Sequence, residues 1–221
     1  MPIITVCNEK GGTGKSSIAQ SLSVYLVQHK KFVLLIDADP QKSTSDWASE
    51  RQESKLNAIP FVEMFRNICE SLIQLSERFD YLVVDCGGAD SKAMRSSLAT
   101  SDIALLPFRP KRRDLRIAHD MAEIVETAKA LNTKLKVLSI ITQAPTHPNQ
   151  KYRIENAKKL LSPLGLNPLD SFTRNLNAWD EAEESGCSVL EYTEDKKAAN
   201  DAKNLFTDTS FAQAYKILEM A

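Results

Sequence analysis

A short segment near the N-terminus has the composition of a loop that binds phosphate. Residues 8–17 read NEKGGTGKSS, and an apolar run precedes them. Glycines let the backbone turn so that several N–H groups converge on phosphate oxygens, and the positive end of a following helix adds to the attraction. Lys15 would neutralise the phosphates, and the Ser16 hydroxyl would bind Mg²⁺. We therefore expect the loop to hold a nucleotide through Gly11, Gly12, Thr13, Gly14, Lys15, Ser16 and Ser17.

Aspartates directly follow two other apolar runs. The run FVLLI leads into Asp37 and Asp39, and the run YLVV leads into Asp85. In a parallel sheet the carboxyl ends of the strands meet at one edge, and ligands bind there. Nucleotide phosphates are bound together with a divalent ion, so we expect Asp85 to hold Mg²⁺ through water. Each aspartate taken alone could instead be a residue of a strand-end turn or a helix N-cap.

Short apolar runs and amphipathic stretches alternate along the chain. The runs are continuously apolar, which is typical of strands buried on both faces of a parallel sheet, and the stretches have the apolar spacing of helices. Strands are expected at 3–6, 32–36, 81–84, 103–107, 135–141 and near 170–174. Helices are expected at 15–30, 62–78, 91–99, 114–131, 151–163, near 177–185 and from about 194 onward. The alternation predicts a doubly wound α/β fold, with a mostly parallel sheet flanked by helices.

The composition favours one domain over residues 1–221. The chain is 43% hydrophobic, enough to bury a core, and no low-complexity linker divides it. Lys and Arg total 28 against 29 for Asp and Glu, so attraction to a nucleic acid or a membrane must come from a local patch. The four cysteines form no CxxC, and the three histidines lack metal-binding spacing. These patterns argue against a disulfide framework and a zinc site.

The sequence carries no pattern for export or for crossing a membrane. The N-terminal apolar run is short and ends at a polar loop, and no apolar run approaches the ~18 residues that a membrane span requires. We therefore expect a cytoplasmic protein.

The phosphate-loop segment departs from the common pattern GxxxxGK[ST], which needs glycine where this chain has Glu9. It reads KGGTGKS, and it resembles the deviant Walker A motif of the ParA/MinD family of ATPases. The resemblance extends over IDADPQ at 36–41, LLPFRPKRRDL at 105–115 and TRNLNAWDEAEESGCSVLEY at 173–192. In that family the lysine at the position of Lys10 reaches the partner's phosphates across a dimer interface. The resemblance therefore implies a homodimer in the ATP-bound state.

The resemblance also implies roles for the two aspartates of IDADPQ. It places Asp39 on the attacking water and Asp37 near Mg²⁺, and it implies that Lys10 and Lys15 take part in catalysis. The chain has no NKxD motif, so guanine is not indicated. ATP with Mg²⁺ is expected because the family uses it. Segment 142–145 lies where a loop could touch adenine.

Within the family, the chain is most similar to short ParA proteins, because no helix-turn-helix segment precedes the first strand. ParA dimers bind DNA without sequence preference, and a ParB-like or other cargo adaptor stimulates hydrolysis, which implies association with the nucleoid. Matching to basic positions of relatives predicts DNA contacts by Arg174, Lys196 and Lys197, and we add Lys203, which lies nearly two turns further along the same expected helix. A second basic run comprises Lys111, Arg112, Arg113 and Arg116. Either run could instead be an ordinary solvated surface.

Three other functions are open at this stage. A MinD-like membrane ATPase would end in an amphipathic helix, but the tail SFAQAYKILEMA has one lysine and reads better as a packed helix. An iron–sulfur carrier shares the phosphate loop, and Cys86-Gly87-Gly88 superficially resembles a cluster-binding segment. A non-hydrolysing clamp would use nucleotide only to dimerise, but the intact Asp37, Asp39 and Asp85 argue against it.

Overall fold

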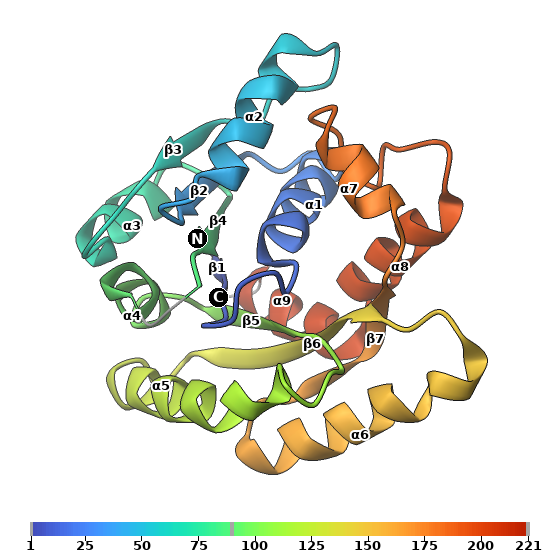
Figure 1. Ribbon diagram of the computed structural model, residues 1–221. Helices are drawn as coiled ribbons and strands as arrows, with labels where there is room; N and C mark the ends of the chain where they lie inside the picture. Colours follow the sequence, from blue (N-terminus) through green and yellow to red (C-terminus); the bar gives the residue numbers. More distant parts are fainter. Residues whose placement is uncertain (1, 89–90, 220–221) are drawn as a thin grey trace.

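The fold is built on one seven-stranded sheet. The computed structural model describes residues 2–88 and 91–219 (Figure 1). The strands lie in the order β3-β2-β4-β1-β5-β6-β7, and every pairing in the described chain is parallel. Their bounds are Ile3–Val6 (β1), Val33–Ala38 (β2), Phe61–Glu63 (β3), Tyr81–Cys86 (β4), Ile103–Phe108 (β5), Lys136–Ala144 (β6) and Pro168–Arg174 (β7). This confirms the predicted doubly wound fold and shows that its sheet is wholly parallel in the part described.

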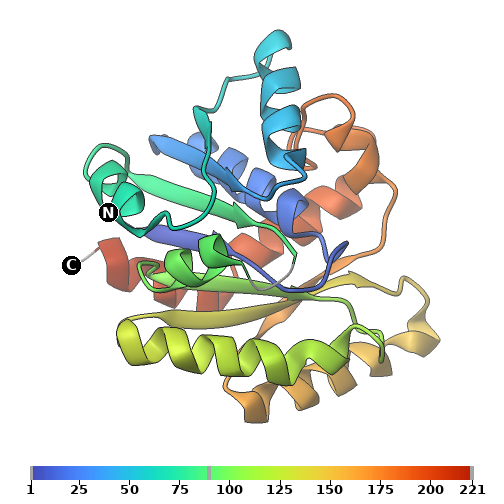
Figure 2. The same ribbon diagram turned by 60° about the vertical axis from the view of Figure 1, so that its left-hand side comes forward.

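Helices cover both faces of the sheet, as Figures 1 and 2 show. The first cluster of buried side chains joins one face to α3 (Cys69–Ser76), α4 (Lys92–Leu98), α5 (Ala118–Leu131) and α6 (Tyr152–Leu161). The second joins the opposite face to α1 (Lys15–Gln28), α2 (Ser43–Glu53), α7 (Ala178–Glu183), α8 (Lys196–Phe206) and α9 (Thr209–Glu219). Burial on both faces explains why the strand sequences are continuously apolar.

The helix predicted over 62–78 is wrong in its first half. Residues Phe61–Glu63 form the edge strand β3, which pairs with β2 in the register Leu35 to Phe61. Arg66 then adopts a left-handed φ of 71°, and the Asn67 side chain accepts a hydrogen bond from the backbone N–H of Cys69. This local turn starts α3 only at Cys69. Pairing along the sheet edge therefore overrides the helical spacing of the apolar residues.

The expected long C-terminal helix is interrupted. It divides into α8 and α9, and Asp208 lies at the break. The Asp208 carboxylate accepts hydrogen bonds from the backbone N–H of Ser210 at 3.0 Å and from the Ser171 hydroxyl at 2.6 Å, so it both caps α9 and ties the break to β7. Phe211 and Ala214 of α9 are buried in the second core cluster. Residues 220–221 of the tail, and the side chains of 215–219, lie outside the described part.

Helix α2 was not expected from the sequence. Its sequence STSDWASERQE is mostly polar and has no apolar stripe, and only Trp47 and Ala48 anchor it in the core. Within the described residues, no helix is both long and apolar enough to cross a membrane.

Candidate nucleotide site

The predicted phosphate loop connects β1 to α1 at the carboxyl edge of the sheet, and hydrogen bonds to the neighbouring strands β5 and β6 hold it in place. The buried Asn8 amide donates to the Pro107 carbonyl at 2.7 Å, and the Asn8 side-chain oxygen accepts from the backbone N–H of Lys10 at 2.8 Å. The hydroxyl of Thr142, on β6, donates to the Thr13 carbonyl at 2.7 Å. Gly14 precedes α1 with a left-handed φ of 83°, which favours glycine there. The loop conformation is thus set by contacts with β5 and β6.

A cavity of about 510 Å³ lies above this loop. Lys15 lines it and is almost fully buried; its ammonium donates to the Lys10 carbonyl at 3.3 Å. Of the predicted phosphate-binding residues, Thr13 is buried beneath the loop and the others line the cavity. The full lining is Glu9, Gly11, Gly12, Gly14, Lys15, Ser16, Ser17, Asp39, Gln41, Ser43, Gly88, Gln143, Asp180 and Glu183. The volume and the converging donors are suited to a polyphosphate.

Two of the predicted carboxylates lie side by side at the base of this site. Asp37 on β2 and Asp85 on β4 are paired in the strand register, and both are fully buried. The Thr44 hydroxyl donates to Asp85 Oδ2 at 2.7 Å, whereas Asp85 Oδ1 is buried and has no hydrogen-bond partner among the described residues. Burial raises the pKa of Asp85 to about 7, although hydrogen bonds from Thr44 and Ser16 oppose the rise.

This environment fits a magnesium ion. An ionised carboxylate with an unpartnered buried oxygen is stabilised by a nearby cation, and Mg²⁺ prefers oxygen ligands while keeping several waters. Within the described residues, no three His, Cys, Asp or Glu side chains gather into a metal cluster, so phosphate and water would supply most ligands. Ser16 and Asp85 are in hydrogen-bond contact with each other, and these two side chains could hold the ion directly or through water.

The Asp37 carboxylate accepts hydrogen bonds from the first turn of α2. Its Oδ2 accepts from the Ser45 backbone N–H at 2.7 Å and from the Ser45 hydroxyl at 2.8 Å, and its Oδ1 accepts from the backbone N–H of Asp39 at 3.0 Å. Burial raises the pKa of this carboxyl, and these hydrogen bonds lower it. Because both oxygens accept hydrogen bonds from the protein, an indirect contribution near the metal fits Asp37 better than direct coordination.

Asp39 extends into the phosphate cavity from the loop after β2. Its Oδ1 accepts from the backbone N–H of Gln41 at 2.9 Å. Gly87 lies directly against it, since a Cβ atom at that position would be 2.8 Å from Asp39 Oδ1. Glycine at position 87 therefore permits the loops after β2 and β4 to meet. A carboxylate placed beside the phosphates in this way could orient a water molecule.

A narrower pocket of about 110 Å³ adjoins the phosphate cavity. Gly14, Ser17, Gln143 and Asp180 line both spaces, so a nucleotide could extend from one into the other. The Trp179 indole N–H lines the smaller pocket and is buried without a hydrogen-bond partner among the described residues, so it could donate to a base. Segment 142–145 contributes Thr142 and Gln143, as expected, but the sequence patterns gave no role to Trp179.

Helix α7 also brings a carboxyl to the phosphate loop that the sequence reasoning missed. Glu183 lines the phosphate cavity and is in hydrogen-bond contact with Ser17. Burial raises the pKa of Glu183, the Ser17 hydrogen bond lowers it, and its Oε1 has no partner among the described residues. The acidic composition of 180–184 was the available signal, but it equally fits a solvated helix.

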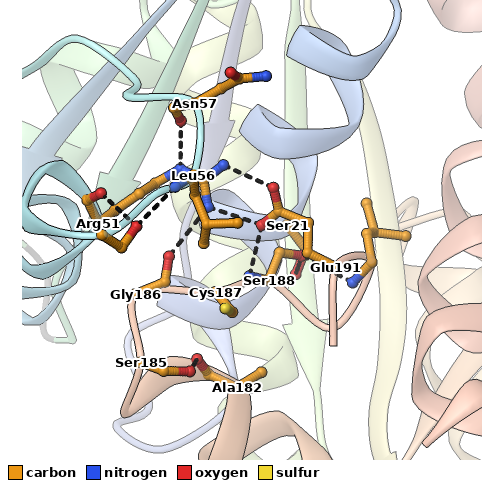
Figure 3. Close-up of polar contacts among 12 residues, drawn as sticks. Ser21, Arg51, Leu56, Asn57, Ala182, Ser185, Gly186, Cys187, Ser188 and Glu191 are labelled. Atoms are coloured by element: carbon orange, nitrogen blue, oxygen red, sulfur yellow. Dashed lines mark hydrogen bonds and ion pairs between the residues drawn. The ribbon is translucent and has the colours of Figure 1, made fainter. Parts of the chain in front are cut away.

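A buried ion pair joins α2 to the segment that follows α7, as Figure 3 shows. The Arg51 guanidinium donates to both carboxylate oxygens of Glu191 at 2.7 and 2.8 Å. It also donates to the Gly186 carbonyl at 3.1 Å and to the Asn57 carbonyl at 2.8 Å. The Trp47 indole adds a bond to the Cys187 carbonyl at 2.9 Å. Helix α2 also carries Thr44 and Ser45, which donate hydrogen bonds to Asp85 and Asp37. The ion pair therefore fixes the position of these two carboxylates relative to α7.

The residues predicted to contact DNA lie outside these cavities except for Arg174. The Arg174 guanidinium is bound to Asp201 at 2.7 Å, and Arg174 lines the smaller pocket of about 110 Å³. Lys196, Lys197 and Lys203 are exposed along α8, on the sheet face opposite to α5 and α6. The basic run Lys111, Arg112, Arg113 and Arg116 is exposed between β5 and α5.

The cysteine of the Cys-Gly-Gly segment is poorly placed for an iron–sulfur cluster. Cys86 is fully buried and its sulfur lies 3.4 Å from the Ser97 hydroxyl. Burial raises its pKa to about 12, whereas cluster ligands are thiolates.

Known proteins match this chain over most of its length. The model of the CobQ/CobB/MinD/ParA nucleotide-binding domain matches residues 4–181. The carboxysome distribution protein A of Halothiobacillus neapolitanus is 27% identical over 205 residues, covering 91% of this chain and 92% of that protein. Protein ParA of Rhizobium radiobacter is 26% identical over 208 residues, covering 88% and 93%.

Solved structures show the same fold. The MinD cell division ATPase of Pyrococcus furiosus superposes with a TM-score of 0.71 at 18% identity and covers 98% of this chain and 99% of that one. The ATP complex of McdA(D38A) from Cyanothece also gives 0.71 at 18% identity and covers 92% and 95%. The family match spans the phosphate loop, both aspartate motifs and most of the cavity lining. The chain therefore belongs to the CobQ/CobB/MinD/ParA family and is a ParA/MinD-like nucleotide-binding ATPase.

Proposed function

We propose that this protein is an ATP-dependent positioning or partitioning ATPase. It binds ATP and Mg²⁺ in the two adjoining cavities, forms a homodimer in the ATP-bound state, and then binds DNA without sequence preference. A ParB-like or other cargo adaptor stimulates hydrolysis and release. DNA binding would associate the protein with the nucleoid. The relatives named for carboxysome distribution and for ParA support a role in placing a large cargo.

The observation that carries this proposal is the arrangement of Lys10 in the phosphate loop. Its backbone is fixed at both polar groups, because its N–H donates to Asn8 Oδ1 at 2.8 Å and its carbonyl accepts from Lys15 at 3.3 Å. Its ammonium, in contrast, forms no hydrogen bond or ion pair with the residues that the structure describes. A cation on a fixed backbone, next to the phosphate cavity and without an internal partner, is suited to phosphates of a second subunit.

The side chains around the cavity can divide the chemistry of hydrolysis. Lys15 and the loop N–H groups stabilise the charge on the phosphates, and Asp39 orients the attacking water. Ser16 and Asp85 would hold Mg²⁺, which when bound would further neutralise the phosphate oxygens. Lys10 from the partner subunit adds a cation that is present only in the dimer, so dimerisation and turnover are coupled.

The DNA-binding surface we propose is the exposed side of α8. The ammonium groups of three exposed lysines form no ion pair with the residues that the structure describes: Lys196, Lys197 and Lys203. Non-specific binding needs only cations placed along the DNA phosphates. Arg174 contributes less free charge than the sequence indicated, because Asp201 neutralises it at 2.7 Å. A dimer doubles the number of phosphate contacts, which makes DNA affinity depend on ATP.

The decisive test is Lys10→Ala, with Lys134→Ala as a matched loss of an exposed lysine outside the cavity lining. Lys10→Ala should bind a fluorescent ATP analogue through Lys15, yet light scattering should show a monomer with ATP. Its DNA affinity in a gel-shift assay should fall by roughly tenfold or more at moderate salt, because half the phosphate contacts are lost. Lys134→Ala should dimerise like the parent.

Two results would separate the parts of the proposal. If Lys10→Ala dimerises with ATP as the parent does, the cross-subunit lysine is wrong. If the parent dimerises but shifts no DNA at low salt, or if Lys196→Ala with Lys197→Ala and Lys203→Ala leaves the shift unchanged, the DNA surface is wrong while the ATPase assignment stands.

A further inference from the structure

A second large hollow lies away from the nucleotide site. It has a volume of about 750 Å³ and is formed by the segment 110–119 on one side and α6 on the other. We call it the basic groove. It shares no lining residue with either nucleotide cavity. Its lining comes from the segment that leads into α5 and from α6. Helices α5 and α6 lie on the face of the sheet opposite to α8 (Figure 1).

Four exposed cations line the basic groove: Lys111, Arg112, Arg116 and Arg153. No ion pair joins any of them to an acid among the described residues, and the groove lining includes no Asp or Glu. The neighbouring Arg109 differs, since its guanidinium is bound to the buried Asp114 at 2.8 Å. In a chain with net charge −1, four unpaired cations around one hollow form a local field that attracts an anion.

The groove also exposes apolar side chains. Tyr152 is 57% exposed and Leu160 is 40% exposed, whereas the Ile154, Ala157 and Leu161 side chains of the same helix are buried in the core. Tyr152, Asn156 and Leu160 are spaced four residues apart, so they form a stripe about 12 Å long on the groove side of α6. In addition to the apolar face that the core buries, α6 thus presents two apolar side chains to the groove, Tyr152 and Leu160, with the polar Asn156 between them.

We propose that the basic groove is a docking site for an acidic segment of a partner protein that also carries apolar side chains. The cations match carboxylates, and the stripe of Tyr152 and Leu160 matches apolar side chains between them. Duplex DNA fits less well, because phosphates would satisfy the cations but would leave the exposed Tyr152 and Leu160 side chains uncovered. The proposal requires neither dimerisation nor DNA binding, because the groove is separate from the nucleotide cavities.

The test is fluorescence anisotropy with the full chain and defined probes. The first probe is a labelled peptide that alternates Glu or Asp with Leu and Phe. The second replaces Leu and Phe by Ser, the third replaces the acids by Lys, and the fourth is a labelled DNA duplex. We expect the first peptide to bind best, the Ser peptide about tenfold more weakly, and the Lys peptide not at all.

Two variants and one control assign the binding to the groove. Arg112→Glu with Arg116→Glu should weaken the first peptide by about tenfold or more, and Tyr152→Ser should weaken it by about tenfold. Arg113→Glu is the matched control, because Arg113 is exposed in the same segment but does not line the groove. It should change the affinity by less than about threefold. Circular dichroism and ATP binding should be unchanged in all three.

Several results would overturn the proposal. Equal weakening by Arg113→Glu, or equal binding of the Ser peptide, would mean diffuse charge attraction without a groove. If the duplex binds and the peptide does not, and if duplex binding is lost in the variant Arg112→Glu with Arg116→Glu, the groove is a nucleic-acid surface. Loss of ATP-dependent dimerisation in that variant would make it a subunit interface.

Discussion

Replacing Glu191 with Leu should destabilise the protein strongly, because it leaves a buried guanidinium without its counter-ion. The Arg51 side chain is 1% exposed, so water cannot take over the role of the carboxylate at 2.7 and 2.8 Å. Removing one partner of a buried ion pair costs about 3–5 kcal/mol. In a domain of this size each kcal/mol lowers Tm by about 2–4 °C, so we expect a loss of about 6–20 °C.

The double variant tests whether the ion pair or the rest of the network carries this energy. Arg51→Met alone also removes the donors of the Gly186 and Asn57 carbonyls, at 3.1 and 2.8 Å, and should cost about as much as Glu191→Leu. The combination Arg51→Met with Glu191→Leu leaves no unpaired charge. It should therefore be more stable than the sum of the single losses by about 2 kcal/mol or more.

Calorimetry and urea denaturation of the four proteins would measure this cycle. Affinity for an ATP analogue is the functional readout, since Figure 3 shows that the same pair connects α2 to the segment after α7. We expect Glu191→Leu to weaken ATP binding even at a temperature where it is folded. A Tm within about 1 °C of the parent, or losses that simply add in the double variant, would refute the reasoning.

Three further predictions concern the nucleotide cavity. Lys15→Ala should weaken the affinity for ATP by about 30-fold or more in a titration with a fluorescent analogue, and near-parental affinity would contradict the role of Lys15 in phosphate binding. Asp39→Ala should retain ATP affinity but lower kcat by about 10²-fold or more in a phosphate-release assay, whereas parental turnover would exclude the water-orienting role. Because burial raises the pKa of Glu183, the carboxyl gains its charge beside the phosphates as pH rises through that pKa. ATP affinity should therefore fall with rising pH in the parent, and calorimetric titration should show that Glu183→Gln removes this component of the pH dependence.

Motifs that are contiguous in the chain were readable from the sequence. The phosphate loop needs glycines, lysines and a hydroxyl at fixed spacing between one strand and one helix, and short-range sequence contains all of these. Buried parallel strands are similarly visible as unbroken apolar runs, so every strand except β3 and most helices could be predicted, whereas the order of the strands in the sheet could not. Asp37 and Asp85 were recognisable for the same reason, because each follows such a run directly, whereas the role predicted for Asp39 came from the resemblance of IDADPQ to the family's motif.

Other features depend on contacts between residues far apart in the chain. Asp37 was predicted near the metal, but only the tertiary structure shows its oxygens bound to Ser45 and Asp39. The helix expected from 62 failed because pairing of β3 with β2 at the sheet edge outweighs local spacing. The sequence predicted that Arg174 would be a free cation available to DNA, but in the structure its guanidinium is paired with Asp201.

By itself, the sequence determined the doubly wound topology and the phosphate loop, because both are encoded in local periodicity and spacing. Only the tertiary structure decided how the site is enclosed and what surrounds it. Trp179 and Glu183 of α7 line the cavities beside the phosphate loop, where Glu183 contacts Ser17, and Arg51 pairs with Glu191, which is 140 residues away in the sequence. The physical reason is that burial, charge pairing and cavity shape depend on which distant segments meet, and periodicity along the chain does not carry that information.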